Sequence, residues 1–443
     1  MVDILVIGGG AAGMSAASKA KRMKPDLSIL VVEASNYVSY APCGIPYYVS
    51  GIVDDHMKLI HYPVEFFIKK RGINVMVNTH VIEVNLDDRV AILKSSEKER
   101  EVEFEKLVIA TGAKPIMPPI EGIDLQGIYT LHHIEDGIKL KKAAKESEKI
   151  GIVGGGYIGL EMAEAFIQLG KRVMVFEMLP HVLPNIDEDM AKIVEKTLVS
   201  HGVDLKLDEK VVAFEGEDRV KKVITEKGEY EVDLVLMAVG VKPNADLFKN
   251  SRLEFGVRGA IRVNEKMGTN LENVYAAGDV AETKHLVTGK PTWIPLAQTA
   301  NKMGRVAGAN IAGGDMRFPG VVGTAFTKIF ELHIARTGLT TEEARKEGFD
   351  VTSVNIEART KACFYPSAKL IYVKLIYDKE TRKLLGGQII SEEDATGRIN
   401  VMAAALYAGL SVDEIFYLDL GYAPPFAPVW DPLVIASSIA SRK

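Results

Sequence analysis

Cysteine chemistry in this chain depends on single sulfur atoms, because its 443 residues include only two cysteines, Cys43 and Cys363. They form neither a C-x-x-C nor a C-x4-C pair, so no disulfide framework is expected and a reducing cytosol is indicated. Cys43 precedes Gly44-Ile45-Pro46, which we expect to open a helix whose macrodipole and free amides favour a thiolate. Any redox reaction must therefore use one protein sulfur, with the second supplied by a substrate. Cys363 lies in no motif.

Two glycine-rich turns repeat one pattern, Gly8-Gly9-Gly10-Ala11-Ala12-Gly13 and Gly154-Gly155-Gly156-Tyr157-Ile158-Gly159. Each follows a β-branched strand, precedes a helix, and is followed by an acid, Glu33 or Glu177, 20 or 18 residues beyond its last glycine. In a βαβ unit of about 30 residues, such glycines allow a pyrophosphate to approach the helix N-terminus, and the acid binds a ribose hydroxyl. Two copies on one chain predict two dinucleotides, FAD and NAD(P)H.

The elements that must position these residues form an α/β pattern. Short apolar strands that end in glycine turns lie at 106–112 and 234–240, and a third at 273–279 ends in Gly-Asp. Past about residue 320, apolar and polar residues alternate, which predicts antiparallel strands in a separate α+β domain. The strands, a small-residue helix and a proline-rich segment of that domain are expected at 370–377, 384–390, 399–409 and 423–428.

Composition excludes several classes of function. Net charge is −5 with acidic and basic residues interspersed, so no basic face for nucleic acid is expected. No apolar run approaches the roughly 18 residues that suggest a membrane span. Residues 1–7 lack a basic stretch and predict a buried strand rather than a signal peptide. We therefore expect a cytoplasmic protein without nucleic-acid, membrane or metal partners.

Taken in order along the chain, these motifs resemble those of the pyridine nucleotide–disulfide oxidoreductases. An Ala-Thr-Gly turn at 110–112 and the late pair Gly278-Asp279 complete a resemblance that covers the whole chain. The resemblance implies two Rossmann-like dinucleotide-binding domains, for FAD and NAD(P)H, and a C-terminal α+β dimerisation domain. It assigns residues 1–112 and 245–320 to the FAD-binding domain, 113–244 to the NAD(P)H-binding domain and 321–443 to the dimerisation domain. It also implies a homodimer whose active sites are shared between subunits.

Two further motifs select a branch of this family. Residues 39–47, Ser-Tyr-Ala-Pro-Cys-Gly-Ile-Pro-Tyr, resemble the redox-cysteine segment of coenzyme A disulfide reductases and of NADH oxidases and peroxidases. Residues 421–426 resemble the Tyr-Ala-Pro-Pro motif of coenzyme A disulfide reductases and coenzyme A-dependent polysulfide reductases. Peroxidases and water-forming oxidases place a histidine in the first glycine loop, where this chain has Ala11. The resemblance therefore favours a thiol substrate over peroxide.

The resemblance implies a route for electrons from the nicotinamide through FAD to Cys43. The Cys43 thiolate would attack a substrate disulfide, keep one half as a mixed disulfide with coenzyme A, and release the other half as a thiol. The partner subunit's Tyr422 would donate a hydrogen bond or a proton to the leaving thiolate. Tyr365 is the one phenol where relatives have a tyrosine pair, and Trp430 replaces a basic residue of some relatives.

Cofactor and substrate contacts are implied at further positions. Tyr157 resembles a gate over the flavin, and Glu161 would lie near the nicotinamide. Glu177 would repel a 2′-phosphate, so NADH should be preferred and NADPH accepted at lower efficiency. The cofactor positions are Gly8, Gly10, Ala11, Gly13, Glu33, Ala34, Val81, Thr111, Gly112, Gly154, Gly156, Tyr157, Ile158, Gly159, Glu161, Glu177, Gly240, Gly278, Asp279, Leu296 and Ala297. The coenzyme A positions are Ser15, Lys19, Arg22, Ser39, Arg71 and Asn301.

Several alternatives stay open. Lys19 and Arg22 could equally be solvated residues near the end of a helix, and Arg71 lies in a run of charges that is typical of exposed surface. A reductase of coenzyme A disulfide and a reductase of coenzyme A persulfide or polysulfide share the same sequence features. An NADH oxidase that makes peroxide or water is a second hypothesis, and a redox-sensing flavoprotein is a third.

Overall fold

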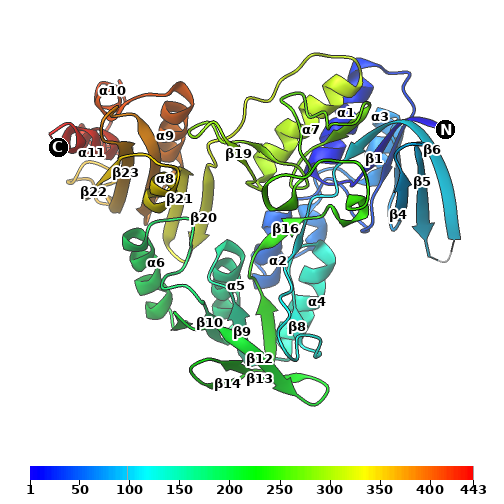
Figure 1. Ribbon diagram of the computed structural model, residues 1–443. Helices are drawn as coiled ribbons and strands as arrows, with labels where there is room; N and C mark the ends of the chain where they lie inside the picture. Colours follow the sequence, from blue (N-terminus) through cyan, green and yellow to red (C-terminus); the bar gives the residue numbers. More distant parts are fainter. Residues whose placement is uncertain (97, 443) are drawn as a thin grey trace.

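The structure is a computed structural model that describes residues 1–96 and 98–442. It contains three sheets of five or more strands, and the chain passes from the first to the second and returns before it builds the third (Figure 1). No helix among the described residues is long and apolar enough to cross a membrane.

The first domain is built on a seven-stranded sheet in the order β3-β2-β1-β6-β5-β4, with β17 paired to β6. Leu5 of β1 lies in parallel register with Leu30 of β2 and Leu107 of β6, and all three are buried in the way expected for a parallel sheet covered on both faces. The strands are β1 (Val2–Ile7), β2 (Ile29–Val32), β3 (Asn74–Met76), β4 (His80–Asn85), β5 (Val90–Ser95), β6 (Lys98–Ile109) and β17 (Val274–Ala276).

Helices α1 and α7 pack directly on each other beside this sheet (Figure 1). A Cβ atom at Gly304 of α7 would lie only 2.2 Å from the Ala12 carbonyl oxygen of α1, so glycine permits the close approach. This contact brings residues near 300 beside the first glycine loop. The helices of the first domain are α1 (Ala11–Met23), α2 (Ile45–Ser50), α3 (Val64–Arg71) and α7 (Ala297–Ile311).

The second domain, the lower lobe of Figure 1 in cyan to green, has a five-stranded parallel sheet in the order β11-β10-β9-β15-β8. Its strands are β8 (Ile128–Tyr129), β9 (Lys149–Val153), β10 (Arg172–Phe176), β11 (Asp204–Lys206) and β15 (Leu234–Met237). Its helices are α4 (Ile134–Lys145), α5 (Tyr157–Gln168) and α6 (Glu188–Ser200).

Smaller antiparallel ribbons lie outside the three large sheets. They are β12 (Val211–Gly216) with β13 (Val220–Thr225) and β14 (Glu229–Glu231), β7 (Ala113–Pro115) with β16 (Val241–Pro243), and β18 (Thr283–Lys284) with β19 (Pro291–Thr292).

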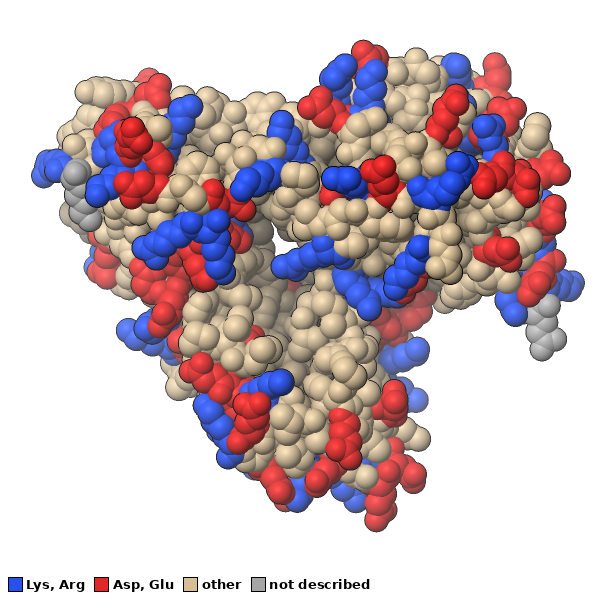
Figure 2. Space-filling view, viewed as in Figure 1, with Lys and Arg blue, Asp and Glu red and all other residues tan. Residues whose placement is uncertain are grey.

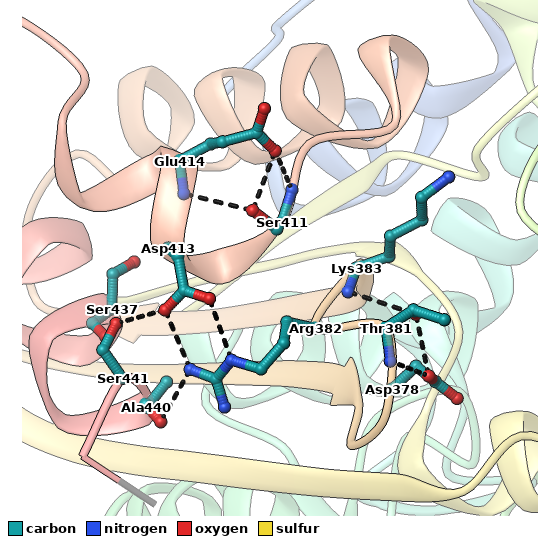
Figure 3. A network of polar contacts seen from close by, with 10 residues as sticks. All are labelled: Asp378, Thr381, Arg382, Lys383, Ser411, Asp413, Glu414, Ser437, Ala440 and Ser441. Carbon is teal, nitrogen blue, oxygen red and sulfur yellow. Dashed lines mark hydrogen bonds and ion pairs between the residues drawn. The ribbon is translucent and has the colours of Figure 1, made fainter.

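The C-terminal domain has a five-stranded antiparallel sheet in the order β20-β21-β24-β23-β22. Arg382, at the turn between β23 and β24, binds Asp413 of α10 and so ties the sheet to the last helices (Figure 3). The strands are β20 (Ala325–Ile329), β21 (Leu332–Gly338), β22 (Val351–Arg359), β23 (Leu370–Asp378) and β24 (Leu384–Ser391). The helices are α8 (Thr341–Lys346), α9 (Thr396–Ala408), α10 (Val412–Phe416) and α11 (Pro432–Ala440).

The predicted α/β fold class, with two dinucleotide-binding folds and a C-terminal α+β unit, is confirmed. The predicted antiparallel strands at 370–377 and 384–390 are β23 and β24, each one residue longer at its end. The helix predicted at 399–409 is α9, which begins three residues earlier. The domain boundaries after residues 112, 244 and 320 stay predictions.

Candidate active site

The two glycine loops have nearly the same backbone geometry. Gly8 and Gly154, the first glycine of each loop, have φ of +106° and +109°, a conformation that side chains rarely adopt. A Cβ atom at either position would lie within 2.4 Å of the carbonyl oxygen of the residue that follows the neighbouring strand, Ala110 after β6 or Ala238 after β15. By contrast, a Cβ at Gly10 or Gly156 would meet no atom within 4 Å. The loops are therefore tightly built yet open where each helix begins, which fits the pyrophosphate of FAD or NAD(P)H.

The acids at the ends of the second strands hold these loops. Glu33 accepts hydrogen bonds from the backbone N–H of Gly9 at 2.7 Å and of Ser35 at 2.8 Å. Glu177 accepts from the matching groups, Gly155 at 2.7 Å and Leu179 at 2.9 Å. Each carboxylate oxygen keeps a further lone pair for a ribose hydroxyl. The acids thus shape the loop as well as offer acceptors to a ligand, which the spacing in the sequence did not reveal.

A cavity of about 1770 Å³ lies between the three domains. Figure 2 shows the molecule hollowed between its upper lobes and its lower lobe, with lysine and arginine side chains at the rim. Eleven predicted site residues line the cavity: Cys43, Gly154, Gly156, Tyr157, Ile158, Glu161, Glu177, Gly240, Asp279, Leu296 and Ala297. The other predicted cofactor residues lie outside its lining: Gly8, Gly10, Ala11, Gly13, Glu33, Ala34, Val81, Thr111, Gly112, Gly159 and Gly278.

Cys43 lies in a one-turn 3₁₀ helix (Pro42–Gly44) that leads into the six-residue α2. The residue is partly open to the cavity, yet the protein atoms around it desolvate the sulfur. This burial raises the pKa of the Cys43 thiol, and the carboxylates of Glu161 and Asp279 raise it further. The expectation of a thiolate favoured by a helix N-terminus is therefore wrong for the protein groups alone, because burial and then the two acids disfavour the charged form of the sulfur.

Glu161 and Asp279 bring titratable carboxyls to the cavity from two different domains. Burial raises the pKa of Glu161 to about 7 and that of Asp279 to about 6. Thr327 of β20 donates a hydrogen bond of 2.7 Å to Glu161 Oε1, which partly opposes the shift. Both carboxyls can therefore change charge near neutral pH, a property typical of catalytic sites.

Tyr157 begins α5 and lines the cavity beside Glu161. Its hydroxyl is buried and makes no hydrogen bond of ordinary geometry among the described residues, although Arg336 and then Asn185 lie close enough to lower the pKa of the phenol. Burial is the larger influence and raises this pKa. The role of Tyr157 as a gate over the flavin stays a prediction.

The predicted coenzyme A residues lie along α1 and its neighbours. Ser15 donates a hydrogen bond of 2.8 Å to Asn301 of α7, and Ser39 has a left-handed backbone with φ of 51°. Arg71 is half-buried rather than fully exposed, because its guanidinium binds Ser18 of α1. No local pattern indicated this contact, since Arg71 stands in a run of charges. Lys19 and Arg22 lie one helical turn apart on the same side of α1.

Tyr365 and Tyr422 lie outside the cavity. Tyr422 is 48% exposed, and Tyr365 is half-buried with the Lys361 ammonium 5.8 Å from its ring centre. Within one chain, neither tyrosine is brought together with the lining that contains Cys43. Their roles stay predictions that depend on a second subunit.

Sequence reasoning missed four polar residues at the site. His132 lines the cavity, and burial together with the neighbouring His133 lowers its pKa to about 4, so its ring is neutral at physiological pH. Lys302 and Arg305, one turn apart on α7, also line the cavity. The spacing of Lys302 and Arg305 could have indicated two cations on one face of a helix. No local pattern could have indicated Thr327, because its partner Glu161 lies 166 residues away in the sequence.

Comparison with known proteins agrees with this geometry. The family described as pyridine nucleotide-disulphide oxidoreductase matches residues 2–304, and the dimerisation domain of the same family matches residues 324–433. The chain belongs to the pyridine nucleotide-disulphide oxidoreductases. The match to the second region indicates that this oxidoreductase forms a homodimer, as the sequence predicted.

Three relatives of this oxidoreductase bear on its branch. A protein of Pyrococcus abyssi named NAD(P)H sulfur oxidoreductase (CoA-dependent) is 49% identical and covers 98% of this chain and 97% of its own. A protein of Methanocaldococcus jannaschii named NADH oxidase is 37% identical and covers 99% of this chain and 98% of its own. The solved structure of an NAD-dependent persulfide reductase from A. fulgidus superimposes with a TM-score of 0.97 at 39% identity, over 99% of this chain and 83% of that one.

Proposed function

We propose that this protein is an FAD-dependent enzyme that uses NAD(P)H to reduce coenzyme A disulfide, or coenzyme A persulfide and polysulfide, through Cys43. The observation that carries the proposal is that Cys43 shares one cavity with the second glycine loop, Glu161 and Asp279, whereas Cys363 lies outside it. A single sulfur at that position can react with a substrate disulfide but cannot form an internal one. The relatives of Pyrococcus abyssi and A. fulgidus support this choice of substrate.

The reaction begins when the Cys43 thiolate attacks one sulfur of the substrate, so that an S–S bond forms on Cys43 and the substrate S–S bond breaks. One thiolate leaves and takes a proton, and half of the substrate stays on Cys43 as a mixed disulfide. FAD, held by the first glycine loop, would supply the two-electron relay from NAD(P)H that reduces this mixed disulfide. One disulfide, one NAD(P)H and one proton thus yield two thiols and NAD(P)⁺.

The protein groups around Cys43 control charge and protons. Glu161 and Asp279 can each hold a proton near neutral pH and release it to a departing thiolate in the cavity. The partner subunit's Tyr422 is the second donor that we propose, since the exposed tyrosine of the same chain lies outside the cavity. Tyr365 is proposed to assist in the same shared active site.

The nicotinamide substrate is proposed to be NADH in preference to NADPH. Glu177 is buried beside the open turn of the second glycine loop, and its carboxylate would repel a 2′-phosphate. No arginine lies next to it, since Met178 and Leu179 follow in the lining. NADPH is expected to be used at lower efficiency.

The test is anaerobic turnover of coenzyme A disulfide by the FAD-loaded protein, with thiol release and NADH oxidation measured together. We expect two thiols for each NADH in the wild type. Cys43→Ser should keep FAD yet lose this turnover almost entirely, whereas the matched control Cys363→Ser should retain it. Oxidation of NADH only in air would instead support an NADH oxidase, the activity named for the relative of Methanocaldococcus jannaschii.

A further inference from the structure

A second buried carboxylate lies beside Glu177 where the second domain lines the cavity. The backbone N–H of Glu209 donates to the Glu177 carbonyl at 2.9 Å, so the segment after β11 runs beside the segment after β10. Glu209 is 5% exposed, and both acids line the cavity. Two neighbouring strands thus bring two carboxyl side chains to one part of the cavity, although 32 positions separate them in the sequence.

Only one oxygen of the Glu209 carboxylate is occupied by protein donors. Thr225 and Tyr230 each donate a hydrogen bond of 2.6 Å to Oε1. The bond to Glu209, followed by burial, raises the pKa of the Tyr230 phenol to about 12. Oε2 accepts no hydrogen bond from the described residues, yet it is not among their fully enclosed unpaired atoms. It is therefore free to accept a hydrogen bond from a ligand in the cavity.

The Glu209 carboxylate also has no cation partner. Among the described residues, no lysine or arginine nitrogen lies within 4.0 Å of it, whereas Lys206 and Lys222 pair with Asp204 and Glu229. A buried carboxylate that is held by two neutral donors alone is costly in free energy. A ligand that brings an N–H or O–H group to Oε2 would reduce this cost, so such a ligand is favoured.

The cavity beside Glu209 has apolar walls. The Phe214 N–H donates to the Glu121 carbonyl at 2.8 Å, so residues 116–121 lie alongside residues 211–214, which begin two positions after Glu209. Apolar residues of these segments and of the loop after β15 line the cavity: Ile116, Pro118, Pro119, Ile120, Val211 and Val239. Apolar walls suit the faces of a planar ring, and the carboxylate suits a donor at its edge.

We propose that Glu209 Oε2 accepts a hydrogen bond from the 6-amino group of the NADH adenine and thereby selects adenine over rings with an acceptor at that position. Glu177 offers its acceptors to the ribose, and the adenine is bonded directly to that ribose, so the ring must lie beside Glu177. Glu209 is the acid that lies there. The inference rests on the proposed function only for NADH as the electron donor, and it makes Glu209 a specificity-determining residue.

The test compares NADH with reduced nicotinamide hypoxanthine dinucleotide, in which a carbonyl oxygen replaces the 6-amino group. Anaerobic reduction of the bound FAD is followed by absorbance without any disulfide. For the wild type, the concentration that gives the half-maximal rate should be roughly 5- to 150-fold higher for the hypoxanthine dinucleotide. This range is expected when one buried hydrogen-bonding group is left unpaired.

Glu209→Gln should reverse this preference. Thr225 and Tyr230 hold the oxygen of the new amide in the place of Oε1, so its NH₂ group takes the place of Oε2. That group can donate to the hypoxanthine oxygen but cannot accept from the adenine amino group. Glu177→Gln should weaken both dinucleotides equally, because they share the same ribose.

Asp208→Asn is the matched control, since it removes one negative charge from an exposed neighbour outside the cavity lining. Asparagine also tolerates the left-handed backbone of Asp208, which has φ of 51°. This variant should keep the wild-type ratio. Equal half-maximal concentrations of the two dinucleotides in the wild type, or the same ratio in the wild type and Glu209→Gln, would overturn the assignment. Failure of NADH to reduce the flavin of the wild type, or to drive thiol release from coenzyme A disulfide, would instead overturn the proposed function.

Discussion

The Lys374 ammonium of β23 lies 2.6 Å from Asp187 Oδ2, and this buried ion pair joins the C-terminal domain to the second domain. Lys374 also contacts Asp189 at 2.7 Å, and Asp187 accepts the Thr341 N–H at 2.9 Å. Asp187 precedes α6 and ends the loop that begins after Glu177. The C-terminal domain therefore helps to place the loop after Glu177, whose residues Met178, Leu179 and Pro184 line the cavity.

Lys374→Met tests this connection. Removal of the cation leaves Asp187 buried without its partner, which typically costs about 3–5 kcal/mol. We expect a lower unfolding temperature and a higher KM for NADH, with FAD content retained. The matched control is Lys192→Met, which removes an exposed cation of α6 that pairs with the equally exposed Glu188. That variant should cost only about 0–1 kcal/mol. Equal losses in the two variants would show that Lys374 has no special role.

Glu161→Gln tests the electrostatic control of Cys43. The carboxylate is one of two charges that raise the pKa of the thiol, so its removal should lower that pKa and speed alkylation of Cys43 by iodoacetamide. Since the pKa of Glu161 is about 7, the difference should appear above neutral pH, where wild-type Glu161 is charged, and vanish well below it.

Cys363 provides the control within the same molecule, because it lies outside the cavity. Peptide mass spectrometry resolves the two cysteines, and the rate at Cys363 should be the same in wild type and variant. Identical pH profiles for Cys43 in the two proteins would contradict the electrostatic account.

Local sequence patterns predicted what depends on local geometry. Each glycine turn with its acid specifies a complete βαβ unit, so Glu33 and Glu177 could be located from spacing alone. The direction in which the pKa of Cys43 shifts could not be predicted from the sequence. It depends on burial and on two acids that lie 118 and 236 positions away, Glu161 and Asp279. The environment of Arg71 was hidden for the same reason, because its partner Ser18 lies 53 residues away on another helix.

The matched acids Glu33 and Glu177 allow one substitution to be compared in two places. In Glu177→Gln, the side-chain amide has only one oxygen, so its NH₂ group would face the backbone N–H of Gly155 or of Leu179. A backbone N–H that loses its acceptor in this way costs about 1–3 kcal/mol of free energy. We expect KM for NADH to rise roughly 5- to 150-fold with FAD content unchanged. Glu33→Gln should instead lower the FAD content of the purified protein, measured by absorbance. Loss of FAD in Glu177→Gln would contradict the separate roles.

The pair of Arg382 and Asp413 makes stability depend on acid pH (Figure 3). Two hydrogen bonds of 2.9 Å join the side chains, and Ser441 also donates to Asp413. These contacts lower the pKa of Asp413 to about 2 from an unfolded value near 3.8. A depressed folded-state pKa means that the stabilisation is complete above the unfolded value and disappears as pH falls through about 2.

Arg382→Met should therefore reduce the free energy of unfolding at neutral pH, and the difference from wild type should shrink toward zero in strong acid. Because Asp413 is 44% exposed, solvent screening limits the expected loss to about 1 kcal/mol. Urea unfolding at several pH values measures the difference. Arg172→Met is the matched control, since its pair with Glu148 is more exposed, at 73% and 68%, and makes one contact at 3.3 Å, so no measurable loss is expected. A loss for Arg382→Met that stays constant down to strong acid would show that packing, and not the ion pair, accounts for the stabilisation.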